Sequence, residues 1–174
     1  GSVALCEGLE NKSSSFADEG TAAHDVAARC LLTNTPAADQ VGQLILVGNG
    51  SVLCTEDMAE SVQVYVDYVQ DVVKSTGGEL FVEVPVPLKH LTNEDDAEGT
   101  SDVVIIAGDE IIVIDLKFGK GVEVSSEKNE QLMIYASGAM RKFAMAGDFK
   151  NVRIAISQPR VSHQPSEWCC TVEE

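Results

Sequence analysis

The sequence lacks apolar runs long enough to cross a membrane, and it lacks cysteine patterns that would hold a disulfide framework. Its longest uninterrupted apolar stretches, such as 103–107, are far shorter than the ~20 residues that a membrane-spanning helix needs. The five cysteines form no C-x-x-C pair and are odd in number, which favours reduced thiols in a cytosolic setting. No signal-peptide pattern is visible either. We therefore expect a cytoplasmic protein that is not associated with a membrane.

Basic residues are scarce. The chain of 174 residues holds 12 Lys and Arg against 28 Asp and Glu, a formal net charge of −16. This balance argues against non-specific binding of nucleic acid over the whole surface. The charge is uneven, because eight of the basic residues but only seven of the acidic residues follow residue 116. An anionic ligand is expected to meet this second half, or to meet metal ions held by acidic residues of the first.

Internal repeats, low-complexity segments and the helix motif of metalloproteases are also absent, and FGKG at 118–121 lacks the spacing of a phosphate-binding P-loop. The remaining composition, 44% hydrophobic and 23% charged, is that of an ordinary globular protein. We expect one domain over residues 1–174, long enough to bury a core. A C-terminal extension stays open as an alternative, because the sequence ends straight after a strand-like segment.

Hydrophobic periodicity predicts an α/β fold with the element order α, α, β, β, β, α, β, in which helices pack on a mixed sheet. Helices are expected at 18–32, 56–76 and about 127–146. Their predicted landmarks are an apolar stripe on the first (Ala22, Val26, Ala27 and Cys30), an N-cap at Thr55 and a stop at Gly77-Gly78 for the second, and a stop at Gly147 for the third.

Strands are expected at 79–87, over a hairpin at 99–117, and at 152–156. Two prolines in the first strand favour an edge or a strand end, and Glu83 within it is interpreted as a solvent-facing edge position. Loops are expected around Pro36 and Gly42, over the acidic segment 93–98 and over the Gly-rich segment 118–122.

The hairpin carries the most informative pattern. Gly108-Asp109 separates its two apolar runs and predicts a two-residue turn. In that register Asp102 faces Asp115 with Cβ atoms ~5 Å apart, and Lys117 shares the face of Asp115 because strand side chains alternate. Both faces are expected to be covered, since each is otherwise aliphatic: Val103, Ile105, Ile112 and Ile114 on one, Val104, Ile106, Ile111 and Val113 on the other.

Two carboxylates ~5 Å apart repel by roughly 3 kcal/mol at an effective dielectric constant of ~20, equivalent to about two pKa units. Lys117 offsets part of this repulsion, and a divalent ion would offset more. Oxygen ligands of this kind suit Mg²⁺ or Mn²⁺. The alternative is a set of strand-end charges that simply face water.

Residues outside the hairpin bear on this choice. Gln131 and Tyr135 are four residues apart, so they share one helix face, and they follow the Asp-x-Lys strand by one loop. His24 lies on the first helix after Glu19-Gly20-Thr21. The alternative for His24 is an ordinary surface or core histidine.

Four short motifs stand in order along the chain: EGTAAH at 19–24, GTSD at 99–102, IDLK at 114–117 and QLMIY at 131–135. Together they resemble those of the PD-(D/E)XK nuclease superfamily in its RecB-like exonuclease branch, and most of all phage and prophage proteins related to the CRISPR-associated RecB-like nucleases. The resemblance covers about residues 19–160. It implies an αβββαβ restriction-endonuclease-like core, a mixed central sheet flanked by helices, which matches the predicted order of elements.

The resemblance implies a Mg²⁺- or Mn²⁺-dependent DNA exonuclease that hydrolyses phosphodiester bonds at duplex ends, in phage recombination or DNA processing. Asp102 and Asp115 would hold the metal with His24 and the carbonyl of Leu116, and Lys117 would orient the attacking water and help to deprotonate it. Gln131 and Tyr135 would position the DNA strand. The cytoplasm of a bacterial host is then the expected location.

Further partners and contacts follow. The resemblance implies a single-strand annealing protein as a partner, and a homo-oligomer stays open. To the implied DNA contacts we add Lys120 and Lys128, in the near-neutral half, as phosphate contacts; the alternative for each is a merely solvated charge. Many relatives carry an iron–sulfur cluster with one early and three late cysteines. Here Cys6 matches the first, but Cys169-Cys170 is not the late triplet, so we expect no cluster.

Two alternative functions remain. One is a structure-specific or restriction-type endonuclease. The other is a non-cutting nuclease-fold module that binds DNA or a protein partner. Asp102, Asp115 and Lys117 argue against the second, because a binding role would not need them.

Overall fold

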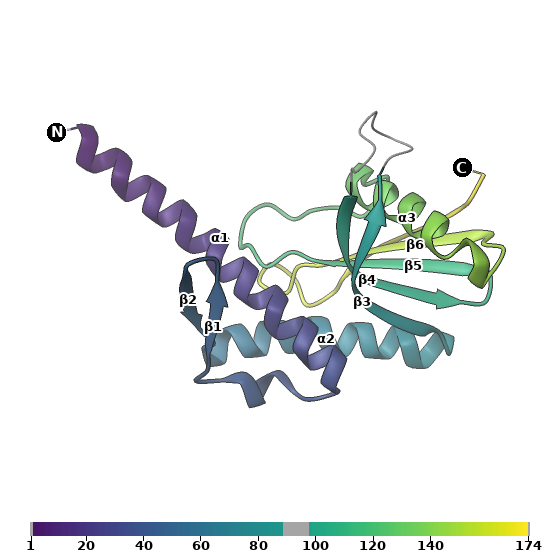
Figure 1. Ribbon diagram of the computed structural model, residues 1–174, viewed down its shortest axis with the longest axis horizontal. Helices are drawn as coiled ribbons and strands as arrows, with labels where there is room; N and C mark the ends of the chain where they lie inside the picture. The colour runs from purple at the N-terminus through teal and green to yellow at the C-terminus, as the bar shows by residue number, and fades with distance from the viewer. Residues whose placement is uncertain (1, 89–97, 174) are drawn as a thin grey trace.

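The computed structural model describes residues 2–88 and 98–173, with side chains from residue 15 onward. A five-stranded mixed sheet forms the body, and helices cover both of its faces (Figure 1). Helices α1 (Ser2–Thr33) and α2 (Glu56–Thr76) pack on one face, and α3 (Glu130–Lys142) packs on the other. The N-terminal half of α1 extends beyond the rest of the molecule. The predicted α/β architecture, a mixed sheet with helices on it, is confirmed.

The sheet has the order β3-β4-β5-β6-β7. Its strands are β3 (Glu79–Pro87), β4 (Glu98–Ala107), β5 (Glu110–Leu116), β6 (Asn151–Ser157) and β7 (Ser166–Thr171). Neighbouring strands are antiparallel except β5 and β6, which are parallel and are connected through α3. Strand β3, with its two prolines, lies at an edge of the sheet as predicted.

The predicted hairpin register is confirmed. Ala107 pairs with Glu110 and Val103 pairs with Ile114, and Gly108 takes the left-handed conformation (φ 60°) that such a turn requires. The two faces of the hairpin belong to two separate cores. Val103, Ile105, Ile112 and Ile114 are buried against α1 and α2, while Val104, Ile111 and Val113 are buried on the side of α3.

Helix α2 begins and ends where the sequence indicates. Thr55 Oγ1 accepts a hydrogen bond from the Met58 N–H at 3.2 Å, which caps the helix. Gly77 ends it with a left-handed backbone (φ 67°) and donates its N–H to the Val73 carbonyl at 2.9 Å. On α1 the predicted apolar stripe is buried throughout.

Two helix boundaries differ from the prediction. Helix α1 already begins at Ser2 rather than at residue 18. Helix α3 begins at Glu130, because Lys128 is left-handed (φ 51°) and the Asn129 side chain accepts from the Leu132 N–H, an N-cap that sets the start. It ends at Lys142, and a 3-10 turn, η2 (Ala144–Ala146), separates it from Gly147, so Gly147 is not its stop.

The segment around Gly42, predicted as a loop, contains structure. A 3-10 turn, η1 (Ala37–Gln40), leads to a small antiparallel hairpin of β1 (Leu44–Val47) and β2 (Gly50–Leu53). Strand β7, which the predicted order of elements omits, adds to the sheet beside β6. The predicted loop 93–98 lies outside the described residues except for Glu98, which begins β4.

The described residues contain neither a membrane-spanning helix nor a disulfide. None of the helices there is long and apolar enough to cross a membrane. None of the cysteines whose side chains are described forms a disulfide. Cys6, the candidate early ligand of a cluster, lies outside the described side chains.

Candidate functional site

Asp102 and Asp115 are the residues next to Val103 and Ile114, the pair at which the hairpin ladder ends. The Asp102 carboxylate reaches across the ladder, and its Oδ2 accepts a hydrogen bond from the Leu116 N–H at 2.8 Å. The backbone of β5 therefore holds the carboxylate of β4 in place. The structure brings together the two aspartates that the hairpin pattern singled out.

Asp115 is buried, with 7% of its surface exposed. Burial and the neighbouring Asp102 carboxylate raise its pKa to about 7, and Lys117 only partly opposes this. Lys117 Nζ forms an ion pair with Asp115 Oδ2 at 3.0 Å, but this oxygen has no well-oriented hydrogen-bond partner among the described residues. Ionisation of Asp115 is therefore costly, because the carboxylate is buried and lies beside a second carboxylate.

His24 joins the two aspartates from α1. Its Nδ1 lies 2.8 Å from the Gly20 carbonyl, and its Nε2 lies 2.9 Å from the Leu116 carbonyl and 3.4 Å from Asp102 Oδ2. Two carbonyl acceptors call for an N–H on each ring nitrogen, so the ring is an imidazolium here. Burial opposes this charge, but the hydrogen bond and charge of Asp102 outweigh burial and raise the pKa of His24 to about 9.

The charge on His24 acts in return on Asp102. Burial disfavours the Asp102 carboxylate, but its hydrogen bond with His24 and the positive charge there hold its pKa below the usual value. The two aspartates are therefore inequivalent: Asp102 is ionised and paired, whereas Asp115 holds a proton up to about pH 7. Their environments push their pKa values apart, which is typical of functional carboxylate pairs.

A chain of hydrogen bonds links this pair to α3. Lys117 Nζ donates to Gln131 Oε1 at 3.2 Å, and Gln131 Nε2 donates to the Tyr135 hydroxyl at 3.3 Å. The Tyr135 ring packs on Gly99, where a Cβ atom would lie 2.9 Å from Tyr135 Cε1. Gly99 thus leaves room for Tyr135, which explains the glycine of the GTSD segment. Gln131 and Tyr135 share one face of α3, as predicted, and Gln131 links this face to Lys117, which directly follows β5.

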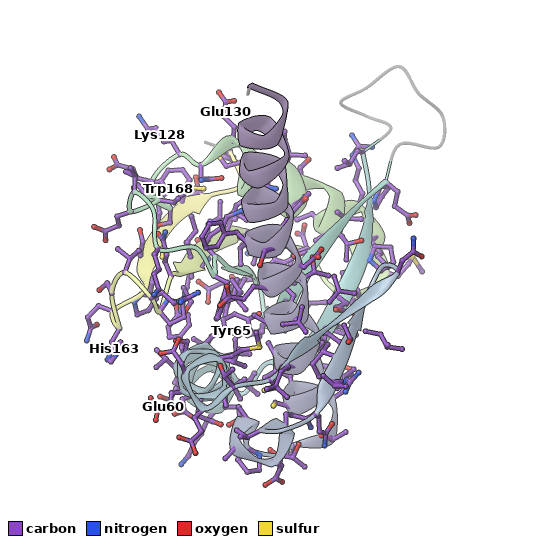
Figure 2. All side chains as sticks on the ribbon, turned by 90° about the vertical axis from the view of Figure 1, so that its left-hand side faces the viewer. Glu60, Tyr65, Lys128, Glu130, His163 and Trp168 are labelled. Atoms are coloured by element: carbon purple, nitrogen blue, oxygen red, sulfur yellow. The ribbon has the colours of Figure 1, made fainter. Side chains whose placement is uncertain are left out.

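The two lysines added as phosphate contacts have different positions. Lys120 lines a pocket between α1 and the loop that follows β5. Lys128 is exposed on the loop before α3 and projects from the periphery of the molecule (Figure 2). The structure brings neither amine into direct contact with the aspartates, and the role of both as DNA contacts stays a prediction.

The whole chain, residues 1–174, matches the model of a family described as "Protein of unknown function (DUF2800)". The chain belongs to this family. No solved structure matches it. Among the described residues of the DUF2800 chain, no three His, Cys, Asp or Glu side chains already form a metal-binding group.

Glu83 is the residue of this DUF2800 site that the sequence pattern did not indicate. It is exposed on the edge strand, as predicted, but it also lines a small cavity with His24, Tyr65 and Asp102. Its backbone is left-handed (φ 50°), and it is skipped in a β3–β4 ladder that pairs Val82 with Val103 and then resumes. Nothing in the alternating sequence of β3 signals this conformation.

Tyr65 lines the buried side of the DUF2800 site. It points from α2 into the interior (Figure 2) and is almost completely buried. Burial and the negative charges of Asp102, Asp115 and Glu83 raise the pKa of its hydroxyl well above the usual value. The Tyr65 hydroxyl therefore stays protonated next to the carboxylates.

Proposed function

We propose that the protein is a Mg²⁺- or Mn²⁺-dependent deoxyribonuclease with a restriction-endonuclease-like core, which hydrolyses phosphodiester bonds at the ends of duplex DNA. One observation carries the proposal. Asp102 and Asp115 meet across the hairpin, with Lys117 Nζ 3.0 Å from Asp115 Oδ2 and His24 Nε2 close to both Asp102 and the Leu116 carbonyl.

The side chains fit a hard divalent cation. Two carboxylates, one imidazole nitrogen and one backbone carbonyl are donors that Mg²⁺ and Mn²⁺ accept. The buried Asp115 Oδ2 has only its ion pair with Lys117, and burial and the charge of Asp102 raise the pKa of Asp115 although Lys117 opposes this. A cation beside Asp115 would therefore stabilise its ionised carboxylate. His24 already directs Nε2 at two other candidate ligands, Leu116 and Asp102, so loss of the Nε2 proton would free the nitrogen to bind a cation.

When bound, the ion would acidify the attacking water and neutralise charge on the scissile phosphate. The chain's own groups then orient the reaction. Lys117 carries an ammonium that Asp115 and Gln131 hold from two sides, so it can hold the water and stabilise negative charge as it develops. Asp102, fixed by the Leu116 N–H, keeps its carboxylate in one orientation.

Gln131 and Tyr135 would position the DNA strand beside Lys117. Their hydrogen bond places an amide and a hydroxyl side by side on α3, and such groups contact phosphate and sugar without reading the sequence. Degradation from an end would leave single strands, which makes a single-strand annealing protein a suitable partner.

The test compares linear duplex, closed circular duplex and single-stranded DNA as substrates, each with Mg²⁺, Mn²⁺ or EDTA. We expect metal-dependent degradation of linear duplex with closed circles spared, and no cleavage by Asp115→Asn. Nicking of closed circles would favour the endonuclease alternative. Lack of cleavage of every substrate with both metals would overturn the proposal.

A further inference from the structure

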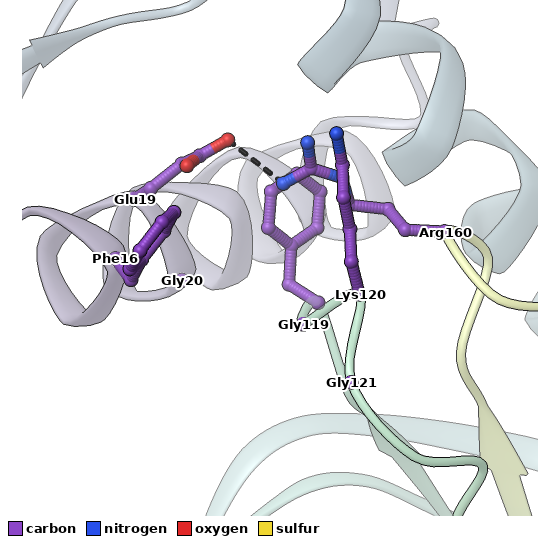
Figure 3. A pocket seen from close by; sticks show the side chains of 8 residues that line it. Phe16, Glu19, Gly20, Gly119, Lys120, Gly121 and Arg160 are labelled. Carbon is purple, nitrogen blue, oxygen red and sulfur yellow. Dashed lines mark hydrogen bonds and ion pairs between the residues drawn. The ribbon is translucent and has the colours of Figure 1, made fainter. Parts of the chain in front are cut away.

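A pocket of about 400 Å³ lies between α1 and the glycine-rich loop that follows β5 (Figure 3). Its walls include Phe16 and Gly20 from α1, Phe118 and Lys120 from the loop, and Arg160 from the segment after β6. The volume is within the range of small-ligand sites. None of these side chains belongs to the proposed catalytic group.

The pocket adjoins the carboxylate site through the backbone. Phe118 directly follows Lys117 in the chain, and Gly20, on the opposite wall, offers its carbonyl to His24 Nδ1 at 2.8 Å. A DNA strand with its scissile phosphate at Asp115 and Lys117 would therefore continue past the mouth of this pocket.

The arginine of the pocket is fixed and already neutralised. Arg160 pairs with Glu19 at 2.9 Å and with Asp57 at 3.6 Å, and its guanidinium stacks 4.7 Å from the centre of the buried Phe118 ring. With 12% of its side chain exposed, Arg160 connects α1, α2 and the loop through its contacts with Glu19, Asp57 and Phe118. It is not the group that meets a ligand.

Two other groups are available. The Phe16 ring is 71% exposed on the α1 wall, a large aromatic face without cover. Lys120 is exposed on the opposite wall, and no ion-pair partner of its ammonium is found in the described part of the chain. One bare aromatic face and one available cation match the two parts of a nucleotide, a base and a phosphate.

We propose that this pocket holds an unpaired nucleotide of the DNA substrate, with its base stacked on Phe16 and its phosphate bound by Lys120. The inference rests on the proposed nuclease function and adds a preference for substrates with a single-stranded overhang. An unpaired base is required because bases within a duplex already stack on their neighbours and cannot offer a face to the ring. The pocket is also too small for a duplex.

Gly20 supports a ligand in this space. It lies in the middle of α1, where glycine costs roughly 1 kcal/mol relative to alanine. A Cβ atom there would meet nothing within 4 Å, and its backbone is not left-handed. Neither packing nor conformation therefore requires glycine at this position, and a longer side chain here would take up space in the pocket that Gly20 lines.

The test measures binding in EDTA, so that no cleavage occurs. The probes are duplexes that are blunt or carry a short 5′ or 3′ overhang with 2-aminopurine, whose fluorescence is quenched on stacking. We expect wild type to bind an overhang more tightly than a blunt end and to quench the probe. Phe16→Ala should abolish the quenching and weaken overhang binding at least about fivefold, the lower end for a base–aromatic stack. Leu32→Ala, at a similarly exposed position of the same helix, is the matched control.

Gly20→Leu separates the ligand role from folding. It should raise the melting temperature, because it improves helix propensity, yet weaken overhang binding because it fills the pocket. Lys120→Ala should weaken binding, whereas Lys150→Ala, at the far end of the sheet, should not. Equal binding and quenching by Phe16→Ala and wild type would overturn the inference. If wild type still cuts DNA, the proposed nuclease function stands without the nucleotide pocket. If Phe16 quenches the probe but the protein cuts no DNA, the pocket binds a nucleotide and the nuclease function is wrong.

Discussion

Leu116 donates its backbone N–H to Asp102 Oδ2 at 2.8 Å, and its carbonyl oxygen lies 2.9 Å from His24 Nε2. A single peptide segment of β5 thus holds an acidic side chain from β4 and a basic one from α1. The Leu116 side chain itself is buried in the core. The geometry of the site is therefore set by backbone that the core keeps rigid.

Asp102→Ala and Asp102→Asn should differ in stability while both abolish metal-dependent cleavage. Alanine leaves the Leu116 N–H without its acceptor in a largely buried place, a loss of about 1–3 kcal/mol, whereas asparagine keeps an oxygen that can accept. Urea unfolding of both variants in EDTA checks this. Equal stability of the two would mean that water satisfies the Leu116 N–H.

Asp115→Asn should raise the melting temperature of the metal-free protein strongly at pH 8, less at pH 5, and hardly at all near pH 3. The folded-state pKa of Asp115 is raised to about 7, so the folded protein binds this proton more tightly than the unfolded chain. The associated stability is present below the unfolded value and is lost as pH rises toward 7. Asparagine mimics the protonated form at every pH. A variant that melts below wild type at pH 8 would contradict the facing-carboxylate interpretation.

The same variant should respond weakly to metal. Wild type should gain about 2.7 kcal/mol of stability at a hundredfold excess of Mn²⁺ over its dissociation constant, and Asp115→Asn should lose most of this gain. Thermal melts with EDTA and with Mn²⁺ measure the difference. An equal metal response in both proteins would show that the ion binds elsewhere.

His24→Ala should shift the Mn²⁺ dependence of cleavage to higher concentration, with activity partly restored by excess Mn²⁺. The reason is the loss of one ligand from a set that keeps both aspartates and the Leu116 carbonyl. His163→Ala is a matched control, because His163 is an exposed histidine on a different segment. A titration curve that His24→Ala leaves unchanged would make His24 a structural residue only.

Gly138→Ala should destabilise the protein by roughly 1–3 kcal/mol, the cost of overpacking. A Cβ atom there would lie 2.8 Å from the Pro87 carbonyl oxygen and 3.1 Å from Val86 Cβ. This close approach sets how α3 lies on β3, and with it the position of Gln131. Gly121→Ala, where a Cβ atom would meet nothing within 4 Å, is the control in urea unfolding. Similar stability of the two variants would show that α3 can move away.

The hairpin was predictable because its information is local. A two-residue turn at Gly108 and strict alternation fix the register, and the register places Asp102 opposite Asp115. The relation of Gln131 to Tyr135 needs only the helical repeat. Helix α2 was predictable for a similar reason, since Thr55 and Gly77 carry its end signals in their own conformations.

Other features depend on distant parts of the chain. Strands β1 and β2 have four residues each, too few for alternation to stand out. The left-handed conformation of Glu83 interrupts an otherwise regular ladder with β4, and its own strand sequence does not encode it. The bond from His24 to Leu116 joins residues 92 positions apart, so only the folded chain brings them together.

The left-handed Glu83 and the two prolines of β3 also govern how this sheet meets other molecules. Pro85 pairs opposite Thr100 and Pro87 opposite Glu98, and neither has an N–H to donate to a ladder. Glu83 lies two residues before Pro85, and its left-handed backbone interrupts the regular strand there. Over residues 83–87, a free strand from another molecule would therefore meet an irregular edge with missing donors. The protein should therefore resist edge-to-edge aggregation along β3, and self-association is expected to use a different surface.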